Sequence, residues 1–265
     1  MYLFWIFLKR GWLRHVSYRL AFVLGIVNVL IGVISFFYLS RLIQAGNTRL
    51  LEAYGNNPAA FLIVGTTFNT FIAVALRAFA LQVQNDQQVG VLEHILMGRV
   101  GLTKLAIYSG VYDLVWSAVV AVASYVLLSV VFGVPFAANP AAVLVFLTSI
   151  LGIAGLGLVS AGVVLVTKQG DPVALTIGLL TGFLSGVYYP PDVLPSWLSS
   201  LSYVLPTTYG LRALRRALIN GDPIGALVGD LTVLLAFAAV TIPVGVWSFH
   251  WGFLKARRDG TLSEY

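Results

Sequence analysis

Six long apolar runs divide this 265-residue chain, and they restrict its possible folds more than any other feature of the sequence. A helix needs about 20 apolar residues to cross the hydrocarbon core of a bilayer. Four of the runs begin with an Asn or Asp that can cap a helix and a Pro suited to its first position, where no N–H is needed. These pairs are Asn57-Pro58, Asn139-Pro140, Asp171-Pro172 and Asp222-Pro223. The sequence therefore predicts an all-α membrane protein, a single transmembrane domain over residues 1–265, with spans at about 20–40, 59–81, 106–132, 141–166, 173–189 and 224–253.

The composition places lipid rather than water around most of the chain. Charged residues make up 10% of the sequence, whereas a soluble domain carries about 25%. There is no cysteine, no group of His, Asp and Glu with metal-site spacing, and no G-x-x-x-x-G-K-S/T phosphate loop. We expect no catalytic residue, no metal and no cofactor bound by this chain. The net charge of +6 indicates membrane topology rather than a nucleic-acid partner, because the basic residues lie beside the apolar runs.

Residues 1–19 mix aromatic with basic side chains and are too short and too charged to cross a membrane. Trp5, Trp12 and Tyr18, for example, accompany Lys9 and Arg10. An amphipathic helix that lies in the interface of the anionic cytoplasmic leaflet suits this mixture. A disordered basic tail is the alternative, although it would leave many aromatic side chains in water.

The basic residues divide unequally between the two sides of a six-span chain. One side carries ten: Lys9, Arg10, Arg14, Arg19, Arg99, Lys104, Lys168, Lys255, Arg257 and Arg258. The other carries five: Arg41, Arg49, Arg212, Arg215 and Arg216. Because cytoplasmic loops hold the excess of Lys and Arg, we expect a multi-pass protein of the cytoplasmic (inner) membrane with both termini in the cytoplasm. Asp230, early in the sixth span, is placed to pair with the arginines at 212–216.

The predicted loop at residues 82–105 is the longest on the cytoplasmic side. It contains Val91, Leu92, Ile95 and Leu96, which form an apolar stripe at helical spacing. A short amphipathic helix that offers a surface to a cytoplasmic partner is one interpretation. An ordinary capped connector is the other.

The stretch from Gly178 to Leu218 is the most unusual part of the chain. Gly178, Gly182 and Gly186 are four residues apart, a spacing that lets two membrane helices approach closely, and we expect them to lie at a central seam. Two prolines then break the helix, and aromatic residues typical of a membrane interface follow. The candidate exit residues are Tyr188, Tyr189, Pro190, Trp197, Tyr203, Pro206, Tyr209, Arg212 and Arg215. The aromatic ones could stack on sugars, hold lipid chains or only anchor the interface.

Two ionisable residues, Arg77 and Asp113, lie at similar depth within the second and third spans. Charges in a membrane are rarely left alone, so we expect them to pair. The pair could pin the inner ends of two helices, or it could serve as a gate or proton relay. Span four is rich in Gly, Ala and Ser between residues 152 and 162, which indicates a packing surface.

Two stretches carry the motifs of one family of membrane proteins. Residues 88–96 read Q-V-G-V-L-E-H-I-L and are similar to a G-T-L-E-x-L-L pattern, with Val91 in place of the threonine. Residues 185–212 are similar to a longer series, S-G-x-x-x-P, L-P-x-W-L, P-x-T-Y and a final R. The matching residues are Ser185-Gly186 with Pro190, Leu194-Pro195-Ser196-Trp197-Leu198, Pro206-Thr207-Thr208-Tyr209 and Arg212. Over nearly its whole length the chain resembles the membrane permease subunit of type-2 ATP-binding-cassette (ABC) exporters.

The resemblance implies a permease that binds a dimer of cytoplasmic ABC ATPases, which would hold the ATP and Mg²⁺. The ATPase-coupling residues would be Gly90, Val91, Leu92, Glu93, Ile95 and Leu96. A second permease copy, most simply a homodimer, would meet the first at spans one and five. Residues 190–222 would then form re-entrant helices at the exit.

The activity implied is ATP-driven export of an amphiphilic substrate, either a drug, a lipid or a lipid-linked glycan, with membrane lipids as further partners. The alternative is an ion-coupled secondary transporter that works without an ATPase. Such carriers usually show more charge at the bilayer midplane, or unwound half-helices, than this sequence does.

Overall fold

The computed structural model describes residues 57–88, 102–134, 137, 139–167 and 171–258, together with Val27, Ile31, Ile34 and Ser35. Within these residues the chain is helical and has no strand. The predicted interfacial helix at 1–19, most of the span at 20–40 and the coupling residues at 90–96 lie outside the described residues.

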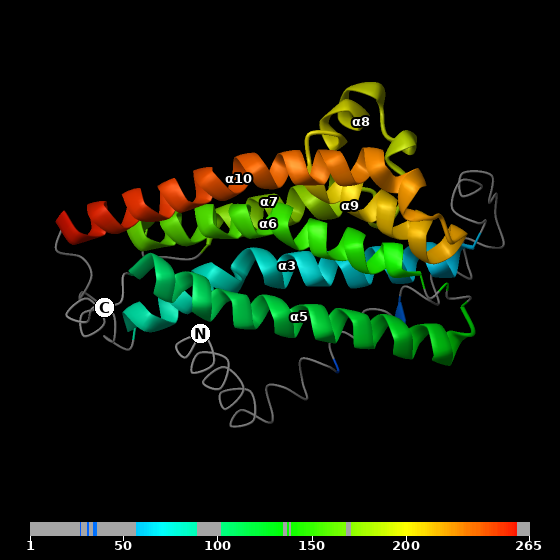
Figure 1. Cartoon of the computed structure of the whole chain (residues 1–265), viewed down its shortest axis with the longest axis horizontal. Coiled ribbons are helices and arrows are strands. Elements are labelled where there is room, and N and C mark those ends of the chain that lie inside the picture. The colour runs from blue at the N-terminus through cyan, green and yellow to red at the C-terminus, as the bar shows by residue number, and fades with distance from the viewer. Residues whose placement is uncertain are drawn as a thin grey trace.

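Five long helices run along the molecule: α3 (Pro58–Gln88), α5 (Leu102–Phe132), α6 (Pro140–Thr167), α7 (Pro172–Leu184) and α10 (Ile224–Arg258). They lie side by side, and successive helices reverse direction from α3 to α7 (Figure 1). Four of them, all but α7, are long and apolar enough to cross a membrane. We call the end where α3 begins the cap end, and the end where α10 finishes the basic end. The length and composition of these helices are those of a multi-pass membrane protein. The loop predicted at 82–105 is shorter than expected, because α3 continues to Gln88 and α5 begins at Leu102.

The predicted capping residues are confirmed at three of the four Asx-Pro pairs. Asn57 Oδ1 accepts from the Ala60 N–H at 3.1 Å and Asn139 Oδ1 from Ala141 at 2.9 Å. Asp171 Oδ1 likewise accepts from Ala174 at 2.8 Å. Each bond satisfies one of the N–H groups that the start of a helix leaves without an intrahelical partner.

Asp222 differs from the other three, because its carboxylate accepts a hydrogen bond from a side chain instead of from a backbone N–H. Its Oδ2 accepts from Arg216 Nε at 2.7 Å. This Asx-Pro pair therefore contributes to a charge cluster at the start of α10.

The small residues of α6 pack against α10, so this surface serves the bundle itself. A Cβ on Gly245 would lie 2.4 Å from the Gly155 carbonyl oxygen, and one on Gly252 would lie 2.2 Å from that of Gly162. Both pairs are spaced seven residues apart, so the two helices run parallel with their backbones in contact. Thr241 Oγ1 adds a hydrogen bond of 3.1 Å to the Gly152 carbonyl. Such approaches between membrane helices depend on small residues.

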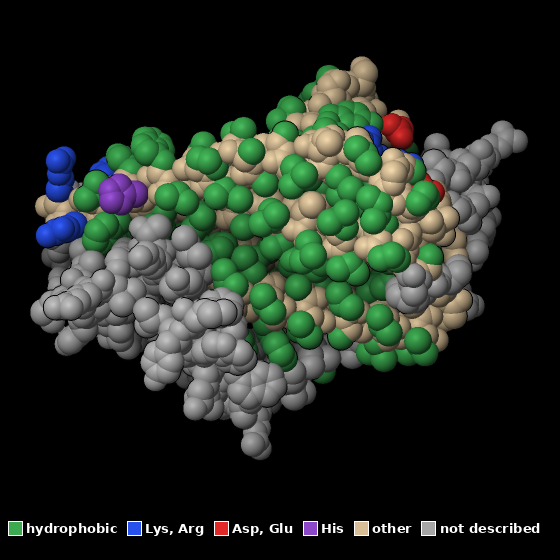
Figure 2. Space-filling model, viewed as in Figure 1, with side chains coloured by type: hydrophobic (Ala, Val, Ile, Leu, Met, Phe, Trp, Pro, Cys, Tyr) green, Lys and Arg blue, Asp and Glu red, His purple; other side chains and the backbone are tan. Residues whose placement is uncertain are grey.

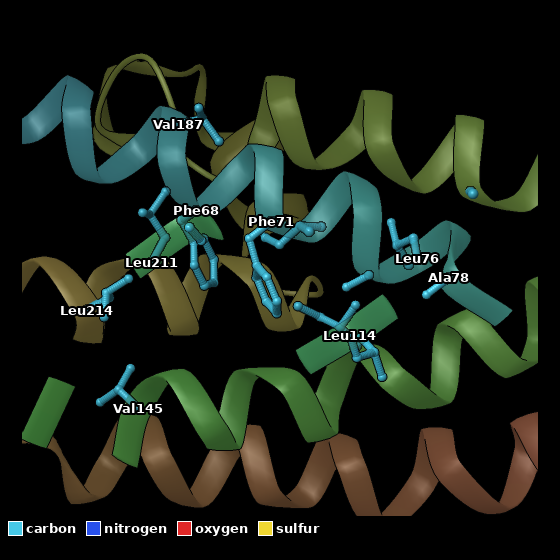
Figure 3. Close-up of a cluster of buried hydrophobic side chains, with 14 of the residues drawn as sticks. Phe68, Phe71, Leu76, Ala78, Leu114, Val145, Val187, Leu211 and Leu214 are labelled. Carbon is cyan, nitrogen blue, oxygen red and sulfur yellow. The ribbon is translucent and has the colours of Figure 1, made fainter. Parts of the chain in front are cut away.

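Helix α3 is the centre of the bundle and packs on both α5 and α6. Its buried Phe68 and Phe71 point toward α6 and α9 (Figure 3). The Phe71 and Phe146 rings are 4.6 Å apart between centroids. Aromatic side chains from α3 are thus inserted among the aliphatic core residues of the later helices.

Helix α7 is shorter than the predicted span at 173–189, and the prediction that Gly186 shares its face is wrong. The helix has 13 residues and ends at Leu184, where the Ser185 N–H bonds to the Thr181 carbonyl. Gly186 has φ +80°, a left-handed conformation that ends a helix and favours glycine. Only Gly178 and Gly182 lie within the helix.

The visible face of the described residues is an apolar band between two charged ends (Figure 2). Lys255, Arg257 and Arg258 occupy the last turn of α10 at the basic end. Acidic and basic side chains appear together at the cap end. Charges at both ends of an apolar band are what a bilayer requires of a helical bundle.

The contact between α6 and α10 can be tested by adding one methyl group. We expect Gly245→Ala to lower the free energy of unfolding by about 1–3 kcal/mol, because its Cβ meets a backbone oxygen that cannot move freely. Gly229→Ala is the matched control on the same helix, since nothing lies within 4 Å of its Cβ position. Thermal unfolding in detergent measures both. Equal midpoints for the two variants would mean that the helices do not approach this closely.

Candidate functional site

The predicted exit stretch folds into short helices at the cap end. They are η2 (Pro191–Val193), α8 (Ser196–Ser202), α9 (Pro206–Arg215) and η3 (Arg216–Asn220), a single turn of π-helix. We call residues 190–222 the capping segment. Its α8 stands out from the bundle, whereas α9 lies against α3, α6 and α10 (Figure 1). Prolines begin η2 and α9, where a missing N–H costs nothing.

Arg215 anchors the capping segment in the interior of the bundle. Its side chain is 2% exposed. Nη1 donates to the Gly186 carbonyl at 2.7 Å, and Nη2 donates to the carbonyls of Val187 at 3.0 Å and Phe61 at 3.1 Å. One guanidinium therefore joins α9, the turn after α7 and the first turns of α3. A hydrogen bond to a charged group is stronger than one between neutral groups.

Two features of the backbone make this arrangement possible. A Cβ on Gly65 would lie 2.6 Å from Arg215 Nη2 and 2.3 Å from the Val187 carbonyl oxygen, so only glycine leaves the room. The left-handed turn at Gly186 leaves nearby carbonyls outside any helix ladder. The Phe61 ring lies against the guanidinium, 3.3 Å from Cζ to the ring centroid.

Sequence reasoning placed Arg215 at the exit surface, and its burial corrects that placement. A side chain that is 2% exposed cannot reach lipid headgroups. The contributions of Phe61 and Gly65 were not foreseen. The sequence offered one signal for this contact, the isolated Gly65 within the second predicted span, because an isolated glycine often marks a close approach of another group to the backbone.

Arg212 and Arg216 form a charge cluster with two acids, which confirms the expected partnership with Asp230. Arg212 Nε donates to Asp230 Oδ1 at 3.1 Å, and its Nη2 contacts the same oxygen. Arg216 Nη1 lies 3.8 Å from Asp230 Oδ2, and its Nε bonds to Asp222. Asp230 is 4% exposed, so this buried carboxylate is neutralised by two cations from α9 and η3.

The exit aromatics separate into packed and exposed groups. Tyr203 and Tyr209 contact Arg212, whose Cζ lies 5.9 and 5.1 Å from their ring centroids. Trp197 on α8 is 69% exposed, and Tyr188 is also exposed. Tyr189 donates its hydroxyl to the Phe183 carbonyl at 2.6 Å, while Pro190 and Pro206 are buried. The rings nearest Arg212 can stabilise its charge, whereas the exposed Trp197 is placed to meet lipid or ligand.

Asn139 fastens the loop before α6 to the capping segment, a contact that the sequence did not predict. Its Nδ2 donates to the Asp222 carbonyl at 2.7 Å and to the Ala217 carbonyl at 3.3 Å. The same side chain caps α6 through Oδ1. One amide thereby links the starts of two spanning helices.

The predicted seam residues lie on α7, and the residues of the predicted intramembrane pair lie on α3 and α5. No described residue lies within 4 Å of a Cβ at Gly178 or Gly182 on α7. Arg77 is exposed on α3 and Asp113 is partly buried on α5, and their pairing stays a prediction. Within the described residues no cluster of His, Asp and Glu could hold a metal ion.

A comparison with protein families identifies the family to which this chain belongs. Residues 2–219 match the model of the family described as ABC-2 type transporter. The chain belongs to the ABC-2 type transporter family. The match reaches from near the N-terminus to η3, so it includes both the bundle up to α7 and most of the capping segment.

This ABC-2 family chain is also similar to the linearmycin resistance permease protein LnrN of Bacillus subtilis (strain 168). The two are 32% identical over 109 residues, which is 41% of this chain and 28% of the relative. The aligned part therefore spans less than a third of the relative's length.

The anchoring role of Arg215 predicts that lysine cannot replace it. We expect Arg215→Lys to lower the free energy of unfolding by about 1.5–3 kcal/mol, because one ammonium cannot reproduce a fork that bonds three carbonyls. Arg212→Lys is the matched control on the same helix. It keeps the ion pair with Asp230 in a half-exposed position and should lose less than about 1 kcal/mol. Thermal unfolding in detergent compares them, and a wild-type midpoint for Arg215→Lys would show that the carbonyl bonds contribute nothing.

Proposed function

We propose that this chain is the permease subunit of an ATP-driven exporter that moves an amphiphilic substrate out across the cytoplasmic membrane. The observation that carries the proposal is the match to the ABC-2 family model over residues 2–219. The relative's printed name, a linearmycin resistance permease, supports the direction of transport. Resistance to a toxic compound is obtained by removing it, and outward transport does so.

The energy for transport is proposed to come from a separate dimer of cytoplasmic ABC ATPases with ATP and Mg²⁺. This sequence has no phosphate loop, so the proposal assigns ATP hydrolysis to the partner rather than to this subunit. The segment from Gly90 to Leu96 is the proposed coupling helix, with its apolar stripe in a groove of the ATPase. It follows α3, which ends at Gln88 on the proposed cytoplasmic side.

We propose six crossings with both termini in the cytoplasm, in which residues 20–40 would provide the first crossing and residues 1–19 the interfacial helix. Helix α7 has 13 residues and is about 20 Å long, shorter than the roughly 30 Å hydrocarbon core. We propose that α9, buried against α3 and α6, re-enters the membrane at the cap end and completes the fifth crossing. The basic last turn of α10 then lies on the cytoplasmic side.

A second copy of the chain is proposed to pack on the open face of α7. No described residue lies within 4 Å of a Cβ at Gly178 or Gly182, and their neighbours Leu179 (67% exposed) and Phe183 (55% exposed) project from the same short helix. Glycines four residues apart, flanked by large exposed apolar side chains, suit close contact between two membrane helices.

The absence of cysteine from the sequence permits a direct test of this seam. We expect Gly178→Cys to form an intermolecular disulfide on mild oxidation in membranes, because a homodimer brings the two α7 helices together. Val130→Cys on α5, at a position 76% exposed, is the control and should stay monomeric. Non-reducing electrophoresis distinguishes the two. Cross-linking of both variants, or of neither, would contradict the seam at α7.

Reconstitution tests the function and separates it from an ion-coupled carrier. In vesicles with the partner ATPase, we expect uptake of an amphiphile only when ATP is supplied. Leu92→Ala should reduce both transport and ATPase association about tenfold, because it removes an apolar side chain from the proposed coupling surface. The purified chain alone should show neither ATP hydrolysis nor transport. Transport by the chain alone under an ion gradient would support the secondary-transporter alternative.

A further inference from the structure

Helix α3 carries one charged residue, Arg77, within the stretch from Pro58 to Leu81 that is apolar enough to cross a membrane. Arg77 lies about 6 Å before Leu81 along the helix axis, toward the proposed cytoplasmic end. Its side chain is exposed and forms no hydrogen bond or ion pair with any residue that the structure describes. An ionisable group inside a membrane span is costly unless another group compensates its charge. Arg77 therefore has a positive charge that an acidic ligand can neutralise.

The exposed face of α3 around Arg77 is narrow. Of the helices long and apolar enough to cross a membrane, α3 is the most covered, with 72% of its apolar stretch buried inside the bundle compared with 28% for α10. We call its exposed residues at helical spacing the α3 stripe: Thr70, Ala73, Val74, Arg77 and Leu81. Ala78 and Ala80, on the two sides of the stripe, are only 2% and 1% exposed. A long molecule can therefore contact α3 only along this stripe.

The α3 stripe combines one cation with an apolar surface. Ala73 and Val74 lie within about 6 Å of Arg77 along the axis, toward the cap end, and Val74 is 43% exposed. The Thr70 hydroxyl, about 10 Å from Arg77 along the axis, already donates to the Thr66 carbonyl at 2.9 Å. The guanidinium is thus the one charged group of the stripe. A ligand that suits this surface has an acidic group at one end and hydrocarbon beyond it.

We propose that Arg77 binds the acidic headgroup, a carboxylate or a phosphate, of the amphiphile that this chain transports. A planar guanidinium can donate two parallel hydrogen bonds to the oxygens of such a group. The tail lies along Ala73 and Val74, and the headgroup lies near the proposed cytoplasmic end of α3. The inference rests on the proposed function for naming the ligand a substrate, whereas the binding itself depends only on the α3 stripe.

Binding is measured on the purified full chain in a non-ionic detergent, with a photoreactive hexadecyl phosphate as the probe. Hexadecyl phosphate and the uncharged hexadecanol are compared as competitors. We expect the phosphate to compete at least about tenfold better, because it makes charge-assisted hydrogen bonds that the alcohol cannot make. Arg77→Gln should abolish this preference, whereas Arg77→Lys should keep part of it.

Arg257→Gln is the matched control, since Arg257 is an exposed arginine in the last turn of α10. It should leave the preference for the phosphate unchanged. Equal competition by the two compounds on the wild-type chain would overturn the proposal. An equal loss of preference in Arg77→Gln and Arg257→Gln would also overturn it, because the attraction would then come from the net charge of the protein.

A second pair of variants tests whether the tail lies on the α3 stripe. Ala73 and Ala123 are both exposed alanines within helices, on α3 and α5 respectively. Ala73→Trp should reduce labelling roughly tenfold, because the indole covers the stripe one turn from Arg77, while Ala123→Trp should leave labelling unchanged. Labelling that persists in Ala73→Trp would overturn the site.

The predicted pairing of Arg77 with Asp113 is the competing role for this arginine. An ion pair stabilises the fold, whereas a binding residue is occupied only by its ligand. We therefore expect Arg77→Gln to keep the wild-type midpoint of thermal unfolding in detergent without the amphiphile. A lower midpoint in Arg77→Gln, together with an unchanged preference for the phosphate, would support the ion pair and overturn the site.

The assembled transporter distinguishes a substrate from a resident lipid. Stimulation of ATP hydrolysis by hexadecyl phosphate but not by hexadecanol, lost in Arg77→Gln, would support an acidic amphiphile as the transported substrate. Binding without stimulation would identify a resident anionic lipid and overturn the assignment of the ligand as substrate. A complex that hydrolyses no ATP contradicts the proposed function, but it leaves the displacement measurement on the single chain valid.

Discussion

The buried guanidinium of Arg215 is the interaction on which the cap end depends. A cation in an apolar interior needs acceptors for its N–H groups, and here three backbone carbonyls provide them. Two of those carbonyls are available because α7 stops at Leu184 and the chain turns at Gly186. The burial of Arg215 therefore depends on the early end of α7. A helix continued through Gly186 would use these carbonyls for its own ladder.

The rest of the capping segment is fixed by charge and by helix ends. Asp230 on α10 receives Arg212 and Arg216, while Asn139 at the start of α6 holds the carbonyls of Ala217 and Asp222. Together with the bond from Arg215 to the Phe61 carbonyl of α3, these contacts tie α9 and η3 to three spanning helices. The cap is thus part of the bundle rather than a loose loop, although α8 projects from it (Figure 1).

The bundle divides into surfaces with different degrees of packing. Between α6 and α10 the backbones are in contact at paired glycines, and there is no room for further atoms. No described residue lies within 4 Å of a Cβ at the glycines of α7, and a pocket lies between α5 and α6. Glycine therefore allows backbone contact between α6 and α10, whereas on α7 it meets no described helix.

The sequence by itself determined the class of the protein, the positions of most spanning helices and three of their caps. Apolar length, Asx-Pro pairs and charge asymmetry are properties of short stretches of sequence. They decide whether and in which orientation a helix inserts into a bilayer, without reference to distant residues. The family followed from motifs for the same reason. The partnership of Asp230 with the nearby arginines was also predictable, because a charge in a span needs a counter-charge at its depth.

Only the tertiary structure decided which small or charged residues face inward. Gly155 and Gly178 belong to similar glycine-rich stretches, yet a Cβ on Gly155 would meet α10 and one on Gly178 would meet no described residue. Arg212 and Arg215 are three residues apart, yet one is half-exposed beside Asp230 and the other is buried under α3. Such differences depend on where a helix distant in the sequence lies. A local sequence pattern cannot predict the position of a helix that is far away in the sequence.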